Sequence, residues 1–160
     1  MAIRKSITEA QQHIAKRRVA RRLAMIGTYQ WIITHNSFND IYVYFQEDRE
    51  LAADFRKCDP AFFHQLLRCA IEDGERIEPL IEPHVDRTLA QIDPIEYAVL
   101  RVACAELINH PETPYKVVVN EAVNLTKKFG ADQAHKFVNG ILDRVATATR
   151  ATEVAATRLE

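Results

Sequence analysis

The apolar residues of this 160-residue chain recur mostly at spacings of three and four positions, without sustained alternation at every second residue. This spacing is typical of amphipathic helices rather than half-buried strands. Three pairs, Asp59-Pro60, Asp93-Pro94 and Thr113-Pro114, each place a capping side chain before a proline suited to the first helical turn. The pattern therefore predicts an all-α protein.

Six or seven helices are expected, and they divide near residues 74–83, where Gly74, Pro79 and Pro83 weaken, bend or end a helix. Gly130 is expected at the C′ position of one helix, and the interior Gly140 suggests a close helix–helix approach. The first helix is expected to begin at a Ser6/Glu9 capping box. The predicted segments are roughly 6–33, 40–57, 60–81, 83–92, 94–109, 114–129 and 132–150.

Composition fits a globular helical protein, with 48% apolar and 27% charged residues and only four glycines. No apolar run approaches the roughly 20 residues that span a bilayer, and the basic N-terminus lacks the apolar segment of a secretory signal. We therefore expect a cytoplasmic protein that does not contact a membrane. On size alone, one compact domain is expected.

Enzymatic and metal-dependent functions have little support in the sequence. The chain lacks the motifs GxGxxG, GxxxxGK[ST], HExxH and GxSxG, so we expect no enzyme and no cofactor. Cys58, Cys69 and Cys104 form no close CxxC pair, which argues against a zinc site. Reduced, buried or half-buried thiols are the simpler interpretation.

Positive charge is concentrated at one end of a nearly neutral chain. Residues 1–22 contain seven lysines and arginines and a single acid, Glu9, whereas the formal net charge of the whole chain is −1. On a helical wheel, Val19, Leu23 and Ile26 share one arc, and the opposite half holds four arginines, Arg17, Arg18, Arg21 and Arg22. A solvated helix face is one interpretation. Because almost no acid is nearby in the sequence, contact with phosphates is favoured, and these arginines are expected to lie off the core.

The densest polar constellation lies around Gly130. Phe129 and Phe137 could stack on unpaired bases or could simply belong to the core. Gln133 and Asn139 could read base edges, although a structural hydrogen bond within the helix is an equally good role for Asn139. The lysines that could contact phosphates here are Lys127, Lys128 and Lys136. Single-stranded RNA suits such a mixture, because its bases are free to stack.

Three segments resemble the NusB family of bacterial transcription antitermination factors. They are PYKVVVNEAVNLTKKFGADQAHKFVNGILDR, IEYAVLRVACAEL and RRVARRLAMIGTYQW. The similarity spans roughly Lys16 to Arg150 and is weaker, in pattern more than in residues, from Phe38 to Ile92. The resemblance implies two packed helical bundles within one compact domain: residues 1–78 and 79–150, followed by a tail, 151–160, that is expected to fray.

The same resemblance implies an RNA-binding antitermination factor that, with the ribosomal protein NusE, binds boxA-type single-stranded RNA and supports transcription of ribosomal RNA operons. Further implied partners are RNA polymerase and other Nus factors in the elongation complex, and a homodimer of the free protein is possible. The positions that match the RNA-binding motif are Arg17, Arg18, Arg21, Phe129, Lys136 and Phe137. Gln133 stands where an acid is common, and His84 where a tyrosine can occur. Tyr29 and Glu96 match positions that contact the protein partner. The alternative is a protein-interaction scaffold that binds no specific RNA.

Overall fold

The computed structural model describes the backbone of residues 2–159 and the side chains of residues 8–159, and this part of the chain contains helices and no strand. The all-α prediction is confirmed, but the expected number of helices is wrong. Nine α-helices are present in the described residues: α1 Ala2–Thr34, α2 Phe38–Glu47, α3 Arg49–Phe55, α4 Pro60–Glu72, α5 Gly74–Ile81, α6 Pro94–Asn109, α7 Tyr115–Phe129, α8 Ala134–Thr149 and α9 Ala151–Arg158.

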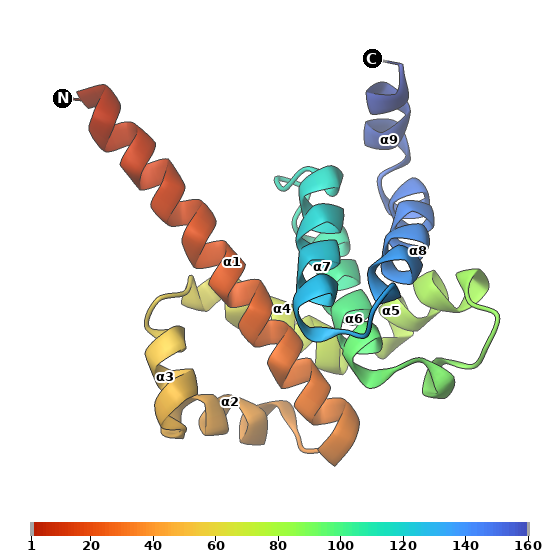
Figure 1. Ribbon diagram of the computed structural model, residues 1–160, viewed down its shortest axis with the longest axis horizontal. Coiled ribbons are helices and arrows are strands. Elements are labelled where there is room, and N and C mark those ends of the chain that lie inside the picture. Colours follow the sequence, from red (N-terminus) through yellow and green to blue (C-terminus); the bar gives the residue numbers. More distant parts are fainter. Residues whose placement is uncertain (1, 160) are drawn as a thin grey trace.

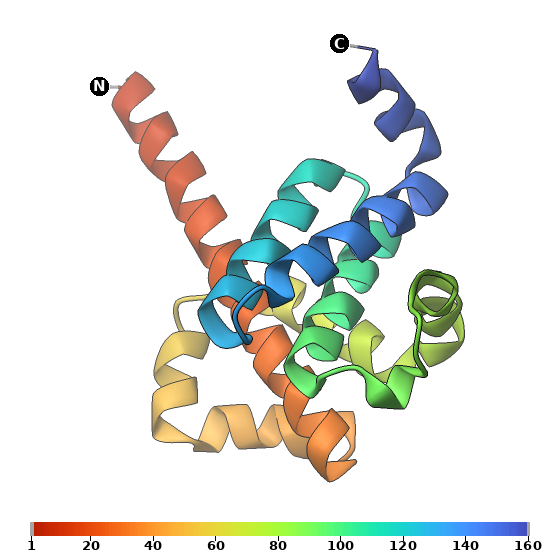
Figure 2. The same ribbon diagram turned by 45° about the vertical axis from the view of Figure 1, so that its right-hand side comes forward.

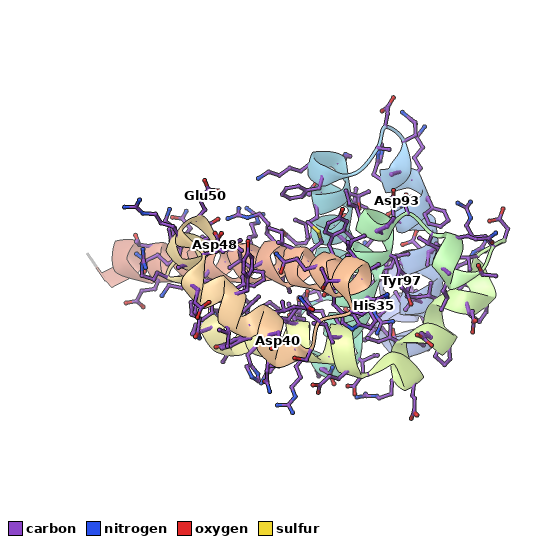
Figure 3. The ribbon with its side chains drawn as sticks, turned by 90° about the horizontal axis from the view of Figure 1, so that it is seen from below. His35, Asp40, Asp48, Glu50, Asp93 and Tyr97 are labelled. Atoms are coloured by element: carbon purple, nitrogen blue, oxygen red, sulfur yellow. The ribbon has the colours of Figure 1, made fainter. Side chains whose placement is uncertain are left out.

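The difference in number arises because two expected helices are each divided, one expected helix is absent, and the tail adds α9. Asp48 separates α2 from α3: its carboxylate accepts hydrogen bonds from the backbone nitrogens of Glu50 (3.1 Å) and Leu51 (3.0 Å) and so begins a new helix. Figure 3 shows Asp48 and Glu50 at this junction. Asp73 separates α4 from α5, which begins at Gly74, the glycine that the sequence predicted would weaken this helix. The segment 83–92 forms two 3₁₀ turns, η1 Glu82–His84 and η2 Leu89–Gln91, instead of a helix.

Two of the three predicted proline starts are confirmed. Asp59 accepts a hydrogen bond from the Phe62 nitrogen, and Asp93 accepts from the nitrogens of Ile95 and Glu96. The predicted start of α1 at the Ser6/Glu9 capping box is wrong, because the helix already begins at Ala2.

The third start differs, because α7 begins at Tyr115 after Pro114, without a side-chain cap from Thr113. Glu153 of α9 fills this role by accepting a 2.8 Å hydrogen bond from the Tyr115 nitrogen. The tail expected to fray is thus helical through Arg158, and its Val154 is buried.

Helix α6 lies at the centre of the molecule, and every residue from Tyr97 to Leu107 is buried. Helices α1, α4, α7 and α8 all pack against it. Helix α1 crosses the molecule as a long rod and also packs against α4, while its first turns project beyond the other helices in both ribbon views (Figures 1 and 2). The position of α1 against α6 therefore decides what α1 presents to solvent.

Close helix packing occurs at a glycine other than the one expected. A Cβ at Gly27 of α1 would lie 2.7 Å from Leu67 of α4 and 3.3 Å from Phe45 of α2. Gly140 is exposed, and no atom of another helix lies within 4 Å of the position its Cβ would take. The prediction for Gly140 is wrong, and the close approach belongs to α1.

Gly130 also departs from expectation. Its φ of −90° lies outside the left-handed region, which Gln133 occupies instead with a φ of 70°. A side chain at Gly130 would place its Cβ 2.8 Å from the Thr126 carbonyl oxygen. Glycine is thus required here by close backbone contact, and the tight reversal between α7 and α8 is completed at Gln133.

Buried arginines connect α6 to the elements around it. Arg101 donates to the Ala70 carbonyl of α4 (2.6 Å) and to the Tyr97 hydroxyl (2.9 Å), and its guanidinium lies 4.6 Å from the Trp31 ring of α1. Arg150, between α8 and α9, reaches the carbonyl oxygens that end α6 and precede α7: Leu107 (2.9 Å), His110 (2.9 Å) and Thr113 (3.0 Å). These bonds satisfy carbonyls that helix ends leave without partners.

The two glycines provide a direct test of the packing. Gly27→Val is expected to destabilise the protein by about 1–3 kcal/mol, because the added atoms must displace buried side chains. Gly140→Ala is expected to stabilise it by roughly 1 kcal/mol, since alanine favours an exposed helical position. Urea unfolding followed by circular dichroism measures both, and equal effects of the two substitutions would contradict the packing described.

The role of Arg150 can be tested in the same way. Arg150→Met is expected to cost at least about 3 kcal/mol, because it removes charge-assisted hydrogen bonds and leaves three carbonyls without their donor. The control is Arg144→Met on the exposed side of α8, expected to change stability by less than about 0.5 kcal/mol. A loss at Arg150 no larger than the loss at Arg144 would show that the end of α8 does not depend on these bonds.

Candidate nucleic-acid interface

A cleft of about 590 Å³ lies between α1 and the start of α7. Its α7 side is formed by positions three and four residues apart, which lie on one helix face. The residues that line it are His13, Ile14, Arg17, Arg18 and Arg21 of α1, and Glu112, Thr113, Pro114, Val117, Asn120, Glu121 and Asn124 opposite. We refer to this cleft as the α1–α7 groove. It brings three of the four predicted arginines together in one place.

Arg21 lies at the base of the groove and is buried, only 6% exposed. Its Nε and Nη2 donate to the two carboxylate oxygens of Glu106 on α6, each at 2.7 Å, which makes a two-pronged ion pair. The expectation that all four arginines lie off the core is therefore wrong for Arg21. Two of its five N–H donors are thus already used inside the protein.

Arg17 is held less tightly. Its Nη1 lies 3.3 Å from the Thr113 hydroxyl oxygen and 3.5 Å from Glu112, and its Nε lies 4.0 Å from Asp59. The guanidinium lies 4.2 Å from the centre of the Phe62 ring, which is a cation–π distance. Its Nε is buried without a hydrogen-bond partner. Since every polar contact exceeds 3 Å, the guanidinium keeps donor capacity for a ligand in the groove.

Arg18 is the most accessible of the four, with a side chain 62% exposed and a 2.9 Å contact from Nε to Glu121 of α7. Arg22 contacts Asp54 of α3 at 3.5 Å and is absent from the lining of the groove. Each arginine thus has an acidic neighbour, and the expectation that acids are scarce around them is wrong. The acids come from segments at least 32 positions away, so the local sequence could not indicate them.

The turn between α7 and α8 carries the second group of predicted residues. Phe129 and Phe137 are half-buried and pack against the core, yet each ring has a cation over it: Lys128 Nζ at 5.3 Å and Arg87 at 5.0 Å, respectively. The predicted contact residues that are exposed in this region are Lys127, Lys128, Gln133, Lys136 and Asn139. The packing of both phenylalanines against the core agrees with the core interpretation, and their partly exposed rings agree with stacking on RNA bases.

The sequence suits Asn139 equally to reading a base edge and to a structural hydrogen bond within α8. Its side chain is exposed and has no hydrogen bond within the described part of the chain.

Along α7, Glu121 in the groove and Phe129 at the turn are eight residues apart, or about 12 Å at 1.5 Å per residue. One helix therefore connects the arginine-rich groove with the aromatic and lysine-rich turn.

The two residues predicted to contact a protein lie on helices that pack together. Tyr29 of α1 is 37% exposed, and Glu96 is half-buried in the first turn of α6. Burial, together with the neighbouring Asp93 carboxylate, raises the pKa of Glu96, and Arg87 opposes this shift. Figure 3 labels Asp93 and Tyr97 at the start of α6 and His35 just after the C-terminal end of α1. His84 is half-buried in η1.

Some residues of the interface were not selected from the sequence. Asn120 and Asn124 on the polar face of α7 are four residues apart, so helical periodicity could have identified them. Arg87 lies between two 3₁₀ turns, and no sequence signal indicates that its guanidinium covers Phe137. Only the folded chain brings these two residues together.

Other kinds of site receive no support from the residues the structure describes. They contain no group of three or more His, Cys, Asp or Glu arranged to hold a metal ion. Burial raises the pKa of Cys58 and of Cys69 to about 11 and that of Cys104 to about 12, so these thiols stay protonated at neutral pH. None of the described helices is long and apolar enough to cross a membrane.

Comparison with known proteins gives a consistent result. The model of the NusB family matches residues 18–147. The transcription antitermination protein NusB of Ralstonia pickettii (strain 12J) is 44% identical over 142 residues, 89% of each chain. NusB of Pseudomonas putida (strain W619) is 42% identical over 144 residues, which cover 90% of this chain and 84% of that protein.

Solved structures agree with the sequence comparison. T. maritima NusB superposes with a TM-score of 0.67 at 25% identity, covering 81% of this chain and 89% of that one. A NusB chain crystallised with NusE and double-stranded RNA gives a TM-score of 0.65 at 26% identity, covering 82% and 96%. The helical fold, the arginine-rich α1 and the sequence relatives lead to one conclusion: this chain belongs to the NusB family.

Proposed function

We propose that this protein is a non-catalytic RNA-binding factor of transcription antitermination, acting in the cytoplasm with the ribosomal protein NusE on boxA-type single-stranded RNA. The observation that carries the proposal is that one helix, α7, links the arginine-lined α1–α7 groove to the turn after α7. Arginines lie along the first part of this helix, and Lys128 and Phe129 lie at its end. The related NusB crystallised with NusE and RNA supports the same function.

In this proposal the arginines have different tasks. Arg18 and Arg17 bind phosphates, because Arg18 is exposed and Arg17 is loosely held. Arg21 positions α1 through Glu106 and does not reach the RNA. Arg22 contributes to the positive potential near the groove rather than to its lining. In this proposal, two of the four arginines of α1 contact RNA phosphates.

The turn between α7 and α8 supplies contacts to bases. Phe129 and Phe137 present partly exposed rings, and an RNA base stacks on either ring once Lys128 or Arg87 shifts toward the neighbouring phosphate. Lys127 and Lys136 neutralise the backbone nearby. Gln133 and Asn139 are exposed amides that read base edges, and the Gln133 amide nitrogen has only a long 3.4 Å contact to the Asp132 carboxylate.

The protein partner binds beside the RNA, over α1 and the start of α6. Tyr29 offers an exposed aromatic ring and Glu96 a carboxylate suited to a basic ribosomal protein. In this view residues 1–78 and 79–150 form two bundles of one domain, and the assembled complex joins RNA polymerase and other Nus factors on ribosomal RNA operons. Without RNA, the same groove is available for a homodimer.

One observation favours the alternative of a scaffold that binds no specific RNA. All four arginines of α1 already contact carboxylates of the protein itself. An RNA phosphate must compete with Glu121 for Arg18, whereas a purely protein-binding surface would need no such exchange. The effect of removing Arg18 on RNA binding distinguishes these functions.

Arg18→Gln is expected to weaken boxA-type RNA binding about tenfold and to reduce the slope of log affinity against log salt by about 0.7, the contribution of one phosphate contact. Fluorescence anisotropy from 50 to 300 mM salt measures both quantities. The melting temperature is expected to stay nearly unchanged, since Arg18 is exposed.

Arg68→Gln provides a matched control. Arg68 of α4 is 59% exposed, and its Nε contacts Glu72 at 3.0 Å, nearly the geometry of Arg18 with Glu121. This substitution is expected to leave RNA affinity unchanged. Equal effects of the two variants, or boxA-type RNA bound no better than scrambled RNA even with NusE present, would refute the proposed function.

A further inference from the structure

Arg101 of α6 is a buried cation that is only loosely paired with a carboxylate. Its side chain is 1% exposed, whereas the carboxylate of Glu78 on α5 lies 3.5 Å from Nη1 and is 49% exposed. A guanidinium removed from water needs close compensation. Neutral groups contribute to it here: the Ala70 carbonyl, the Tyr97 hydroxyl, and the ring faces of Trp31 and Tyr97. Arg101 therefore fixes the placement of neighbours from several elements.

We propose that Arg101 is a positioning residue for the protein-partner surface, which the proposed function places at Tyr29 of α1 and Glu96 of α6. The inference rests on that function and deepens it, because it adds a buried residue to a surface for which only Tyr29 and Glu96 were expected. Arg101 does not touch the partner, since its side chain is 1% exposed. It acts through the residues that lie next to Tyr29 and Glu96 in the sequence.

On α1, Arg101 fixes the direction in which Tyr29 faces. The Arg101 guanidinium carbon lies 4.6 Å from the centre of the Trp31 ring. Trp31 follows Tyr29 by two positions, which at about 100° per residue places the two side chains on nearly opposite sides of the helix. Because Arg101 holds Trp31 against the interior, Tyr29 is turned outward and is 37% exposed.

On α6, Arg101 fixes the turn that carries Glu96. Its Nη1 donates a 2.9 Å hydrogen bond to the hydroxyl of Tyr97, the residue directly after Glu96. Its Nε donates a 2.6 Å hydrogen bond to the Ala70 carbonyl of α4. A planar guanidinium can reach both acceptors and stack on Trp31 at once, whereas a lysine donates from a single nitrogen. One side chain thus sets the end of α1 against the start of α6.

The sign of the effect distinguishes positioning from electrostatic attraction. The proposed partner is a basic ribosomal protein, and a cation repels it. If Arg101 acted through its charge, an uncharged replacement would strengthen partner binding. If Arg101 acts by holding Tyr29 and Glu96 in place, the same replacement weakens binding, because a surface that is not preorganised must be ordered on association.

The test uses the full chain and measures two affinities separately: that for NusE without RNA, and that for boxA-type RNA without NusE. Arg101→Met is expected to weaken NusE binding about tenfold, because no guanidinium then links Trp31 to Tyr97. RNA binding without NusE is expected to stay within about twofold of wild type, since Arg17 and Arg18 are held by α7 and the segment before it.

Trp31 gives a direct reading of the proposed contact, because it is the only tryptophan in the sequence. Arg101→Met is expected to make the fluorescence of Trp31 more readily quenched by acrylamide, since the ring loses the guanidinium packed on it. Weaker NusE binding with quenching at the wild-type level would overturn the inference, because Trp31 would then not have moved.

Arg150→Met is the matched control. Arg150 is also buried, 9% exposed, and also donates to backbone carbonyls, but it lies at the opposite end of α6. Its replacement is expected to lower stability and to leave NusE affinity within about twofold of wild type. Equal losses of NusE affinity in the two variants would show a general effect of destabilisation and would overturn the inference.

Tyr97→Phe tests the same link with a smaller change. It removes only the hydroxyl that accepts from Arg101 Nη1 and keeps the buried ring. NusE binding is expected to weaken about threefold, with RNA binding unchanged. If Arg101→Met does not fold, wild-type NusE affinity in Tyr97→Phe overturns the inference.

These outcomes are distinct from a failure of the proposed function. If wild-type protein binds NusE and prefers boxA-type to scrambled RNA, but folded Arg101→Met binds NusE as tightly as wild type, only the positioning role is refuted. Tighter NusE binding by Arg101→Met refutes it as well and identifies a role through charge. A wild-type protein that binds neither NusE nor boxA-type RNA specifically refutes the proposed function, on which this inference rests.

Discussion

The buried ion pair between Arg21 and Glu106 is the interaction on which the arrangement of the other helices depends. A charge removed from water costs several kcal/mol unless it is closely paired, and here two 2.7 Å hydrogen bonds supply that pairing. The pair joins α1 to the central helix α6 beside apolar side chains of α6 and α7, including Val102, Val118 and Ala122. Its geometry fixes the rotation of α1 about its own axis.

Once the rotation of α1 is fixed, the positions of its other arginines follow from helical geometry. Arg18 is three residues before Arg21 and faces α7, whereas Arg22 turns toward α3. Arg17, four residues before Arg21, lies between Phe62 and the segment before α7. One buried cation therefore orients the exposed ones, and a single helix, α7, connects them to the aromatic turn. An arginine-rich helix can in this way combine structural and ligand-binding positions at adjacent residues.

Much of the fold could be predicted from the sequence because helix starts are local signals. Asp59 and Asp93 cap helices as expected, since each needs only the backbone nitrogens that follow it. Thr113 does not, because Glu153, 38 residues from Tyr115, supplies the acceptor instead. Gly140 and Gly27 differ for the same reason: a close approach depends on which helix lies opposite, and the chain alone does not reveal that.

The candidate site shows the same division between local and long-range information. The residue types and their clustering on α1 and α7 were evident, and the family resemblance located them. The acidic partners were not evident, because Glu106 and Glu121 are 85 and 103 positions from the arginines they contact. As a result, the buried Arg21 could not be distinguished from the exposed Arg18 by sequence spacing. The distinction between a positioning arginine and a phosphate-binding arginine is the central claim of this account.

The most direct test replaces the buried pair with apolar residues, in the variant Arg21→Met/Glu106→Met, and measures its affinity for boxA-type RNA. Apolar residues of similar size often substitute for a buried ion pair with little loss of stability. If Arg21 positions α1 and does not touch the RNA, the double variant is expected to fold cooperatively and to keep the wild-type slope of log affinity against log salt, because no phosphate contact is lost. A folded double variant whose slope is smaller in magnitude by about 0.7 would contradict the account, because it would show that Arg21 itself neutralises an RNA phosphate.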